Sequence, residues 1–367
     1  MKLSRLDDWL SKYENAEFNL GESGVENMLL NQVLSLVEDK RDYLNLTFDH
    51  NETKGSQRLR EQVASLYQNI TLENILITAG VSEALLVYFH SRFTPGSNVI
   101  VPVPTFHSLY DVPAMLGYEV KKIPLSQLNN FELSVDLIVQ AVDEKTRTII
   151  LNSPNNPSGV VYSKEALEEI ADAIKGYDCD LVIDEHYRLL SLNPQEPVAP
   201  SAIDYLPEAI VFGSAGKCLG CVGLRVGWLA ANKRVIQSCD NVKLLTTHAI
   251  SKVNDYLMYQ ILSHRKPFID RFASWIKENI ECFDRLQKKH SDYLGWFRPM
   301  AGTMGFPFLK QGLGSLDFCR ELVEKKGVLV LPGECFDVPG YFRMRLGVRP
   351  EYFNEAMNRM AELLEPI

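Results

Sequence analysis

Short apolar runs alternate with amphipathic stretches between about residue 74 and residue 212. Each run is continuous and rich in Ile, Leu, Val or Phe, as is typical of strands buried on both faces. The runs are 75–77, 99–101, 148–151, 181–183 and 209–212. Helices are expected at 80–92, at 106–116 and after Ser163, a favourable N-cap residue. Strands that alternate with helices predict an α/β fold with a mainly parallel sheet between helices.

The pattern changes beyond about residue 265. A long helical stretch runs to about His290, and strand-like segments follow at 305–308 and 342–346. We expect this part to form a smaller α+β domain that the first 45 residues join. The predicted division is therefore a large domain, 46–265, and a small domain made of 1–45 and 266–367.

Polar clusters follow four of the predicted strands. They are 78–82, 152–157, 184–187 and 214–217. In parallel sheets, ligands bind outside the carboxyl ends of the strands. Because packing alone hardly explains small or reactive residues at four strand ends, we predict the ligand site at this edge of the sheet.

Composition and charge restrict the class of protein. The chain has 367 residues with 46% hydrophobic content, which allows a substantial core. Its net charge of −9 argues against a nucleic-acid or anionic-membrane partner, because both need a basic surface. The first 18 residues are charged throughout, and no stretch has the ~20 apolar residues of a membrane span. We therefore expect a cytoplasmic protein.

The seven cysteines do not predict a disulfide framework or a metal site. Their number is odd and they are scattered along the chain. Cys218 and Cys221 form a C-x-x-C motif, but a zinc site needs a second ligand pair at suitable spacing. We interpret both as small residues that line a loop.

Lys217 is the strongest candidate for chemistry. It follows the apolar run 209–212 on a glycine-flanked loop, three residues after Ser214 and eight before Arg225. A lysine amine forms a Schiff base where its surroundings lower its pKa, and the hydroxyl and guanidinium can hold one phosphate. An amine and a phosphate clamp are what pyridoxal 5′-phosphate (PLP) needs. A lone loop lysine is more often an ordinary surface residue, so the PLP interpretation depends on the other motifs.

Those motifs supply the remaining parts of a PLP site. Gly80-Val81-Ser82 opens a helix, whose free N–H groups favour a phosphate. Phe106 can cover a ring, or be a core residue, and the amide of Asn156 can donate to a phenolate-like oxygen. Asp184 ends an apolar strand, so its buried carboxylate needs a cation such as a protonated pyridine nitrogen. Tyr187 lies three residues further on and can reach the same ring.

Together these motifs resemble the class I/II aminotransferase family of fold-type I PLP-dependent enzymes, over nearly the whole chain. The segments 330–336 and 55–60 match the family as well. The resemblance implies an aspartate aminotransferase-like fold, with a mainly parallel seven-stranded sheet in the large domain. It also implies PLP as the cofactor, an amino acid substrate and a homodimer with shared active sites.

The resemblance implies a role for each motif. Lys217 carries the Schiff base, Asp184 pairs with the pyridine nitrogen and Phe106 stacks on the ring. Asn156 and Tyr187 donate to the ring hydroxyl, and Asn156 also faces the substrate. The phosphate cup is Val81, Ser82, Ser214 and Arg225, and Arg343 binds the substrate α-carboxylate through its planar guanidinium.

Some positions depart from the family pattern. His50 stands where a tyrosine usually reaches the phosphate of the partner subunit, and Arg345 stands where a small polar residue is usual. The elements 22–26 and 106–111 are similar to capreomycidine synthase and related PLP cyclases, which act on hydroxylated arginines. Glu22 and His107 are the substrate-binding candidates in these elements. Their ordinary interpretations are a solvated loop charge and a helix-start residue with a satisfied hydrogen bond.

Two enzymatic hypotheses remain open. A cyclase dehydrates a hydroxylated arginine to a cyclic guanidino amino acid such as capreomycidine or enduracididine, and carboxylates such as Glu22 and Asp49 then face the cationic substrate. An aminotransferase instead passes the amino group of an L-amino acid to a keto acid with the same core residues. A PLP-binding regulator would carry a DNA-binding appendage, for which this acidic chain shows no signal.

Overall fold

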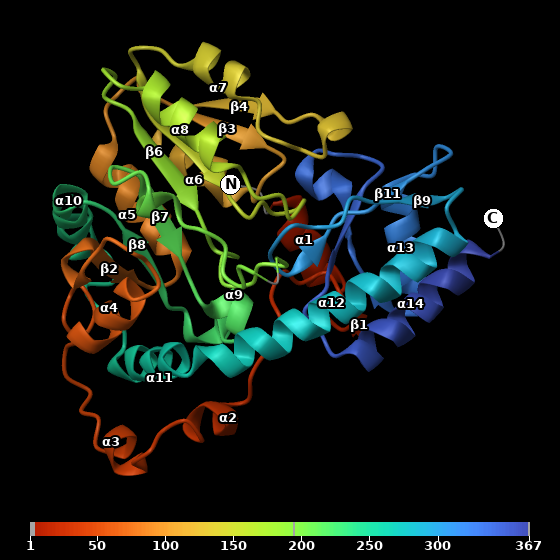
Figure 1. Cartoon of the computed structure of the whole chain (residues 1–367), viewed down its shortest axis with the longest axis horizontal. Helices are drawn as coiled ribbons and strands as arrows, with labels where there is room; N and C mark the ends of the chain where they lie inside the picture. The colour runs from red at the N-terminus through yellow and green to blue at the C-terminus, as the bar shows by residue number, and fades with distance from the viewer. Residues whose placement is uncertain (1–3, 194, 366–367) are drawn as a thin grey trace.

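The computed structural model describes residues 4–193 and 195–365, and its centre is a seven-stranded sheet (Figure 1). The strand order is β2-β8-β7-β6-β5-β3-β4, and only β8 runs against its neighbours. The strands are β2 Ile75–Thr78, β3 Asn98–Val103, β4 Glu119–Pro124, β5 Thr146–Asn152, β6 Asp180–Asp184, β7 Ile210–Gly213 and β8 Gly227–Ala230. The predicted α/β fold with a mainly parallel seven-stranded sheet is confirmed.

Two strands, β4 and β8, were not among the predicted apolar runs. Strand β4 is the edge strand and half exposed, so its sequence mixes Lys and Glu with apolar residues. Strand β8 has four residues and begins at Gly227. Strand β4 thus lacks a continuous apolar run, and β8, although buried, is a short run without the Ile and Val that are typical of strands.

Helices cover both faces of the sheet because successive strand side chains alternate between them. In β2, Leu76 packs with the first group of helices, while Ile75 and Ile77 face the opposite side. The first group is α5 Val81–Arg92, α6 Ser108–Leu116 and α10 Lys233–Lys243. The opposite face carries α7 Val135–Ala141, α8 Lys164–Ala173, α4 Gln57–Ala64 and α11 Lys252–Ser263.

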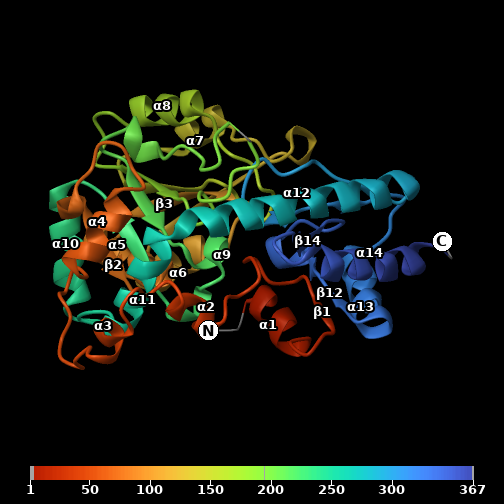
Figure 2. The ribbon, with the colours of Figure 1, turned by 60° about the horizontal axis from the view of Figure 1, so that its bottom comes forward.

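The long helix α12, Arg265–Lys289, runs from the sheet-bearing part to the C-terminal elements (Figures 1 and 2). There it packs against α14 Pro350–Leu364, beside α13 Ser315–Lys326. The short strands there are β9 Leu294–Gly295, β10 Met304–Gly305, β11 Phe308–Leu309, β12 Val328–Leu329, β13 Leu331–Pro332 and β14 Phe342–Arg345. The strand expected at 305–308 is thus two separate strands, β10 and β11. The division at residues 45 and 265 stays a prediction.

The N-terminal elements lie along both parts. They are α1 Arg5–Lys12, β1 Phe18–Asn19, α2 Leu30–Leu34 and α3 Lys40–Leu44. Strand β1 pairs in parallel with β12, and the chain then passes next to α9, Gly216–Leu219. The N–H of Val25 donates to the Lys217 carbonyl at 2.8 Å, and the N–H of Arg345 donates to the Leu20 carbonyl at 2.9 Å. Segment 20–26 therefore connects the lysine loop with β14.

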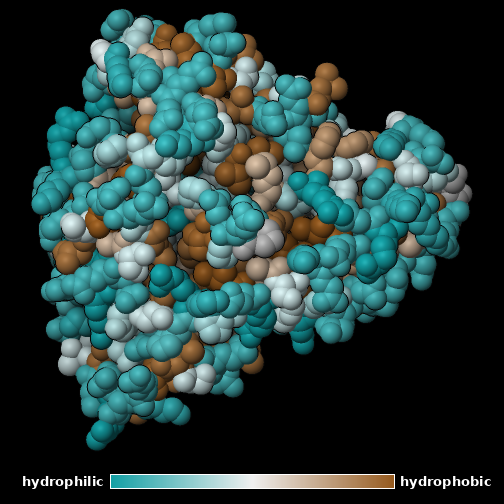
Figure 3. All heavy atoms as spheres, in the orientation of Figure 1, coloured by the Kyte–Doolittle hydropathy of each residue, from teal (hydrophilic) through white to brown (hydrophobic). Residues whose placement is uncertain are grey.

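The surface is hollowed between the sheet and the C-terminal elements. Figure 3 shows apolar side chains gathered in this hollow, whereas the outer faces are mostly polar. Within residues 4–193 and 195–365, no helix is long and apolar enough to cross a membrane.

Candidate active site

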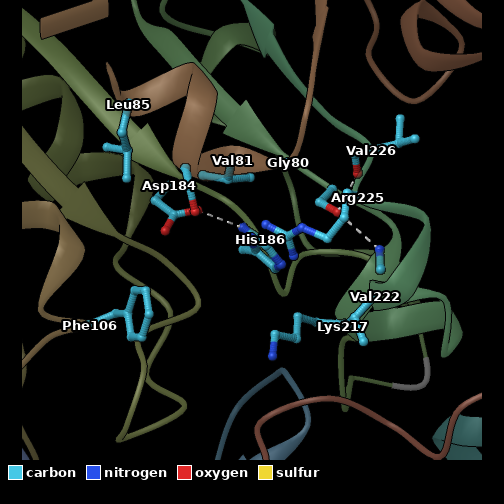
Figure 4. Close-up of a pocket in the computed structure, with 13 residues that line it drawn as sticks. Gly80, Val81, Leu85, Phe106, Asp184, His186, Lys217, Val222, Arg225 and Val226 are labelled. Carbon is cyan, nitrogen blue, oxygen red and sulfur yellow. Dashed lines mark hydrogen bonds between the residues drawn. The ribbon is translucent and has the colours of Figure 1, made fainter. Parts of the chain in front are cut away.

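A cavity of ≈ 170 Å³ opens at the carboxyl ends of the parallel strands (Figure 4). Seven of the residues predicted for cofactor binding line it, from five separate strand ends and turns. They are Val81, Ser82, Phe106, Asp184, Ser214, Lys217 and Arg225. The structure therefore brings together residues spread over more than 140 positions of the chain at the predicted edge of the sheet.

Lys217 projects into this cavity from α9 (Figure 4). Its pKa is lowered to about 8, chiefly by burial; the carboxylate of Glu22 opposes this shift, and the cations of Arg343, Arg225 and Arg345 add to it. Its amine makes no hydrogen bond or ion pair with the described residues. The amine is consequently free to react, and about a tenth of it is unprotonated at pH 7.

Asp184 ends β6 and is 5% exposed. Its Oδ1 accepts a hydrogen bond from the His186 N–H at 3.1 Å. Burial raises its pKa to about 7, and no cationic side chain of the described residues forms an ion pair with it. A buried carboxylate with one hydrogen bond fits a cationic ligand group such as a protonated pyridine nitrogen.

Two glycines make room for a cradle at the N-terminus of α5. Gly80 has φ +80, and a Cβ there would lie 2.7 Å from Arg225 Nη2. A Cβ on Gly227 would lie 2.7 Å from Val81 N. The Arg225 guanidinium can therefore sit over the free N–H groups of a 12-residue helix, an arrangement suited to a phosphate.

Ser214 is fixed at the edge of this cradle. Its Oγ donates to the Val226 carbonyl at 2.9 Å and accepts from the Gly216 N–H at 3.0 Å. The cavity therefore offers three groups: the unpaired Asp184 carboxylate, the free Lys217 amine and the anion cradle at the start of α5. They match the pyridine nitrogen, the aldehyde and the phosphate of PLP, respectively. The residues present therefore fit this cofactor.

Arg343, Asn156 and Tyr187 form a buried group that does not line the cavity directly. Arg343 is 1% exposed; its Nη1 donates to Asn156 Oδ1 at 2.9 Å and its Nη2 donates to the Gly21 carbonyl at 2.6 Å. The Arg343 Nε has no partner among the described residues. Burial raises the pKa of the Tyr187 hydroxyl well above its usual range. Arg343 is thus oriented by the asparagine and by the segment that bears Glu22.

Glu22 is exposed between two buried neighbours, Gly21 and Ser23. The Gly21 carbonyl accepts from Arg343, and the Ser23 carbonyl accepts from the Thr303 hydroxyl at 2.5 Å. The backbone on both sides of Glu22 is therefore held in place. Its carboxylate acts electrostatically on Lys217, Arg343 and Arg345, which places its charge near the cavity.

His50, Asp49 and His107 lie apart from the cavity lining. His50 is exposed, with its ring edge-on to His248 at 5.5 Å, and Asp49 pairs with Lys252 at 2.5 Å. The His107 Nδ1 is 2.9 Å from Asp111 Oδ2 and its Nε2 is 3.4 Å from Asp7 Oδ2. Both ring nitrogens of His107 thus face carboxylates of this chain.

His186 lines the cavity although the sequence analysis did not single it out. The available signal was its position two residues after Asp184, within a polar cluster at a strand end. In the part of the chain that the structure describes, no group of three or more His, Cys, Asp or Glu side chains forms a metal site. Cys218 and Cys221 are buried free thiols whose pKa burial raises to about 12.

Comparison with known proteins agrees with these features. Residues 41–360 match the family described as aminotransferase class I and II. Capreomycidine synthase of Streptomyces vinaceus is 27% identical over 353 residues, covering 94% of this chain and 90% of that protein. A PLP-dependent aminotransferase from Streptococcus suis has a TM-score of 0.92 at 26% identity, covering 100% of this chain and 99% of its own. A PLP-dependent cyclase has a TM-score of 0.90 at 22% identity, covering 100% and 98%, which shows a common fold.

Proposed function

The chain belongs to the class I and II aminotransferase family of PLP-dependent enzymes, and we propose that it dehydrates a hydroxylated arginine to a cyclic guanidino amino acid. The main support for this proposal is the position of the Glu22 carboxylate near Arg343. The backbone carbonyl that precedes Glu22 accepts from Arg343, and the Glu22 carboxylate acts electrostatically on that guanidinium, so we place a negative charge beside the candidate α-carboxylate site. A substrate with an α-carboxylate and a guanidinium complements these two charges.

We propose that the cavity residues hold PLP by its three functional groups. Lys217 binds the aldehyde carbon, Asp184 the pyridine nitrogen, and Arg225, Ser214, Val81 and Ser82 the phosphate. Phe106 covers the ring, and Asn156 and Tyr187 serve the ring hydroxyl. When bound, PLP supplies an electron sink that stabilises negative charge at the substrate α-carbon.

Residues of the chain bind the substrate and transfer the proton. Arg343 fixes the substrate through its α-carboxylate, with Asn156 orienting the guanidinium. The Lys217 Nζ takes and returns the α-proton, for which a pKa of about 8 suits neutral pH. In the overall reaction one C–O bond breaks, one C–N bond to the guanidinium forms, and hydroxyl and proton leave as water. The amino group stays on the product, so no keto acid is consumed.

A specific observation favours the second candidate, an aminotransferase. Arg345 lies two residues after Arg343, on the same face of β14, because alternate residues of a strand share a face. Its Nε has no partner among the described residues, and burial lowers its pKa. A second guanidinium of this kind suits the side-chain carboxylate of a dicarboxylic amino acid. The two candidates therefore predict substrates of opposite side-chain charge.

Incubation with arginine, 3-hydroxyarginine, 4-hydroxyarginine or glutamate, with and without 2-oxoglutarate or pyruvate, separates the candidates by mass spectrometry. We expect a product equal to a hydroxyarginine minus one water in the absence of any keto acid. Amine transfer to a keto acid, with no dehydrated product from either hydroxyarginine, would favour the aminotransferase.

Glu22→Gln tests the proposed side-chain charge. We expect KM for the guanidino substrate to rise about tenfold or more, because a charge pair is lost. Glu38→Gln is the matched control, since Glu38 is exposed and has the same charge. Equal KM values for wild type and Glu22→Gln would remove Glu22 from the substrate site.

We also propose a homodimer in which His50 serves the partner's site. Large apolar side chains within six residues of His50 and His248 in the sequence are exposed: Leu44, Phe48 and Leu245. Exposed apolar side chains of this size favour a partner surface, and closed two-fold dimers are the commonest oligomers. Light scattering that finds an active monomer would contradict this assembly. A cytoplasmic location stays a prediction.

A further inference from the structure

His186 is fixed by its backbone between the two reactive groups of the cavity. Its N–H donates to Asp184 Oδ1 at 3.1 Å, and its carbonyl accepts from Cys218 Sγ at 3.7 Å. Cys218 directly follows Lys217 on α9. The position of the His186 main chain is therefore tied both to the carboxylate and to the helix that carries the amine.

The imidazole of His186 faces the cavity without a partner. Neither ring nitrogen makes a hydrogen bond or ion pair within residues 4–193 and 195–365, and the side chain is among those lining the cavity. In Figure 4 the ring is drawn between the Asp184 carboxylate and the Arg225 guanidinium. By contrast, His107 pairs with Asp111, and His264 contacts the Gln260 carbonyl. A polar ring without a protein partner that lines a cavity is available to a ligand atom.

The groups around His186 keep this ring neutral. The pKa of the imidazole is lowered to about 3, chiefly by burial and to a smaller extent by the cations of Lys217 and Arg225. Asp184 contacts the His186 backbone, and Tyr187 packs beside the ring with centroids 5.4 Å apart. A neutral imidazole has one N–H donor and one nitrogen acceptor, so it offers a hydrogen bond without adding a third positive charge.

We propose that His186 is a further cofactor-binding residue, which hydrogen-bonds bound PLP through a ring nitrogen of its neutral imidazole. Because its N–H group also holds Asp184, the same residue links the cofactor contact to the carboxylate. The proposal rests on PLP as the cofactor and is independent of whether the product is cyclised or transaminated.

Four variants separate hydrogen bonding from packing: His186→Phe, His186→Asn, His186→Gln and His186→Ala. The measurement is the dissociation constant of PLP, obtained by dialysis of the holoenzyme without substrate. We expect His186→Phe and His186→Ala to weaken PLP binding about tenfold, the effect of one lost neutral hydrogen bond. One of His186→Asn and His186→Gln should recover most of this loss, since their amides replace different ring nitrogens.

Thermal unfolding of the PLP-free variants controls for damage to the fold. Losses of PLP affinity with unchanged melting temperatures, together with recovery in one amide variant, would support the proposal. Wild-type PLP affinity in His186→Phe, or equal losses in all four variants, would overturn it. The absorbance band of bound PLP gives a second readout, which should shift in His186→Phe and return in the recovering amide variant.

Discussion

Asp184 and Glu185 are neighbours at the end of β6, but they belong to two different regions of the protein. Both are 5% exposed, and burial raises the pKa of each to about 7. Glu185 accepts from the Ser201 hydroxyl and the Ala202 N–H, and pairs with Arg188 Nε at 3.1 Å. Asp184 accepts only from the His186 N–H among the described residues. The two carboxylates are thus equally buried, but only the Glu185 carboxylate has both an ion pair and several hydrogen bonds within the protein.

Two buried lysines repeat this difference. Lys243 is fully buried, with a pKa lowered by burial, and its amine donates to the Thr53 and His248 carbonyls. Lys217 has a similarly lowered pKa but opens into the cavity without a partner among the described residues. The presence of a cavity does not by itself separate ligand-site groups from packing groups, because a second cavity of ≈ 150 Å³ adjoins the satisfied Glu185. In these two pairs, the group without a partner faces the cofactor cavity, and the satisfied group belongs to packing.

The largest expected effect separates the two lysines. Lys217→Ala should lower turnover by about 10⁴-fold or more, because the reactive amine and proton carrier are lost. Its melting temperature without PLP should change little. Lys243→Met should instead lower the melting temperature, while its turnover per folded molecule stays near wild type. Steady-state kinetics and thermal unfolding of both variants make the check, and reversed outcomes would break the comparison.

Glu185→Gln tests the satisfied carboxylate. The change leaves Arg188 buried without its ion-pair partner, so we expect the free energy of unfolding to fall by about 3–5 kcal/mol. The absorbance of bound PLP should not change, because Glu185 does not line the cofactor cavity. Urea unfolding and absorbance spectra measure the two quantities. A stable variant with altered PLP absorbance would contradict the assignment of Glu185 to packing.

Asp184→Asn is the matched change on the cavity side, with the opposite expected sign. The folded-state pKa of about 7 lies above the usual carboxyl value of 3.8, so the PLP-free protein loses stability as pH rises from about 4 to 7. Removing the charge should therefore stabilise PLP-free protein above pH 7, by up to about 4 kcal/mol. Turnover should fall on the order of 10²–10³-fold, because the pyridine nitrogen loses its counter-charge. Destabilisation at pH 8 would show that Asp184 is satisfied within the protein.

A smaller effect concerns the pH dependence of PLP capture. Only the unprotonated Lys217 amine attacks an aldehyde, and its pKa is about 8. The capture rate by PLP-free protein should fall about tenfold per pH unit below that value and level off above it. In Glu22→Gln the profile should move to lower pH, since Glu22 raises this pKa. Stopped-flow absorbance gives the profile, and a flat one would contradict a free amine.

The sheet and seven of the residues that line its cavity could be predicted because their signals are local. Continuous apolar runs identify strands such as β5, and small or reactive residues follow directly at their ends. Edge strand β4 lacks such a run and was therefore not predicted. The segment 305–308 was predicted as one strand, but Pro307 separates β10 from β11.

The partners of a charge depend on the folded chain and could not be predicted. The tether of Arg343 to Gly21 joins residues 322 positions apart, and His107 meets Asp7 of α1. His186 was missed because its free ring nitrogens are visible only once the cavity is known. Sequence reasoning therefore recovered which residue types meet at the strand ends, but not which of them remain unpaired.

Borohydride reduction of the PLP-loaded protein, followed by peptide mapping, tests most directly that the unpaired lysine holds the cofactor. Reduction makes the bond between PLP and a lysine amine permanent, and mass spectrometry then locates it. We expect a single labelled lysine, Lys217, and no label in Lys217→Ala. A label on the satisfied lysine, Lys243, or on any other lysine of the wild-type protein would contradict it.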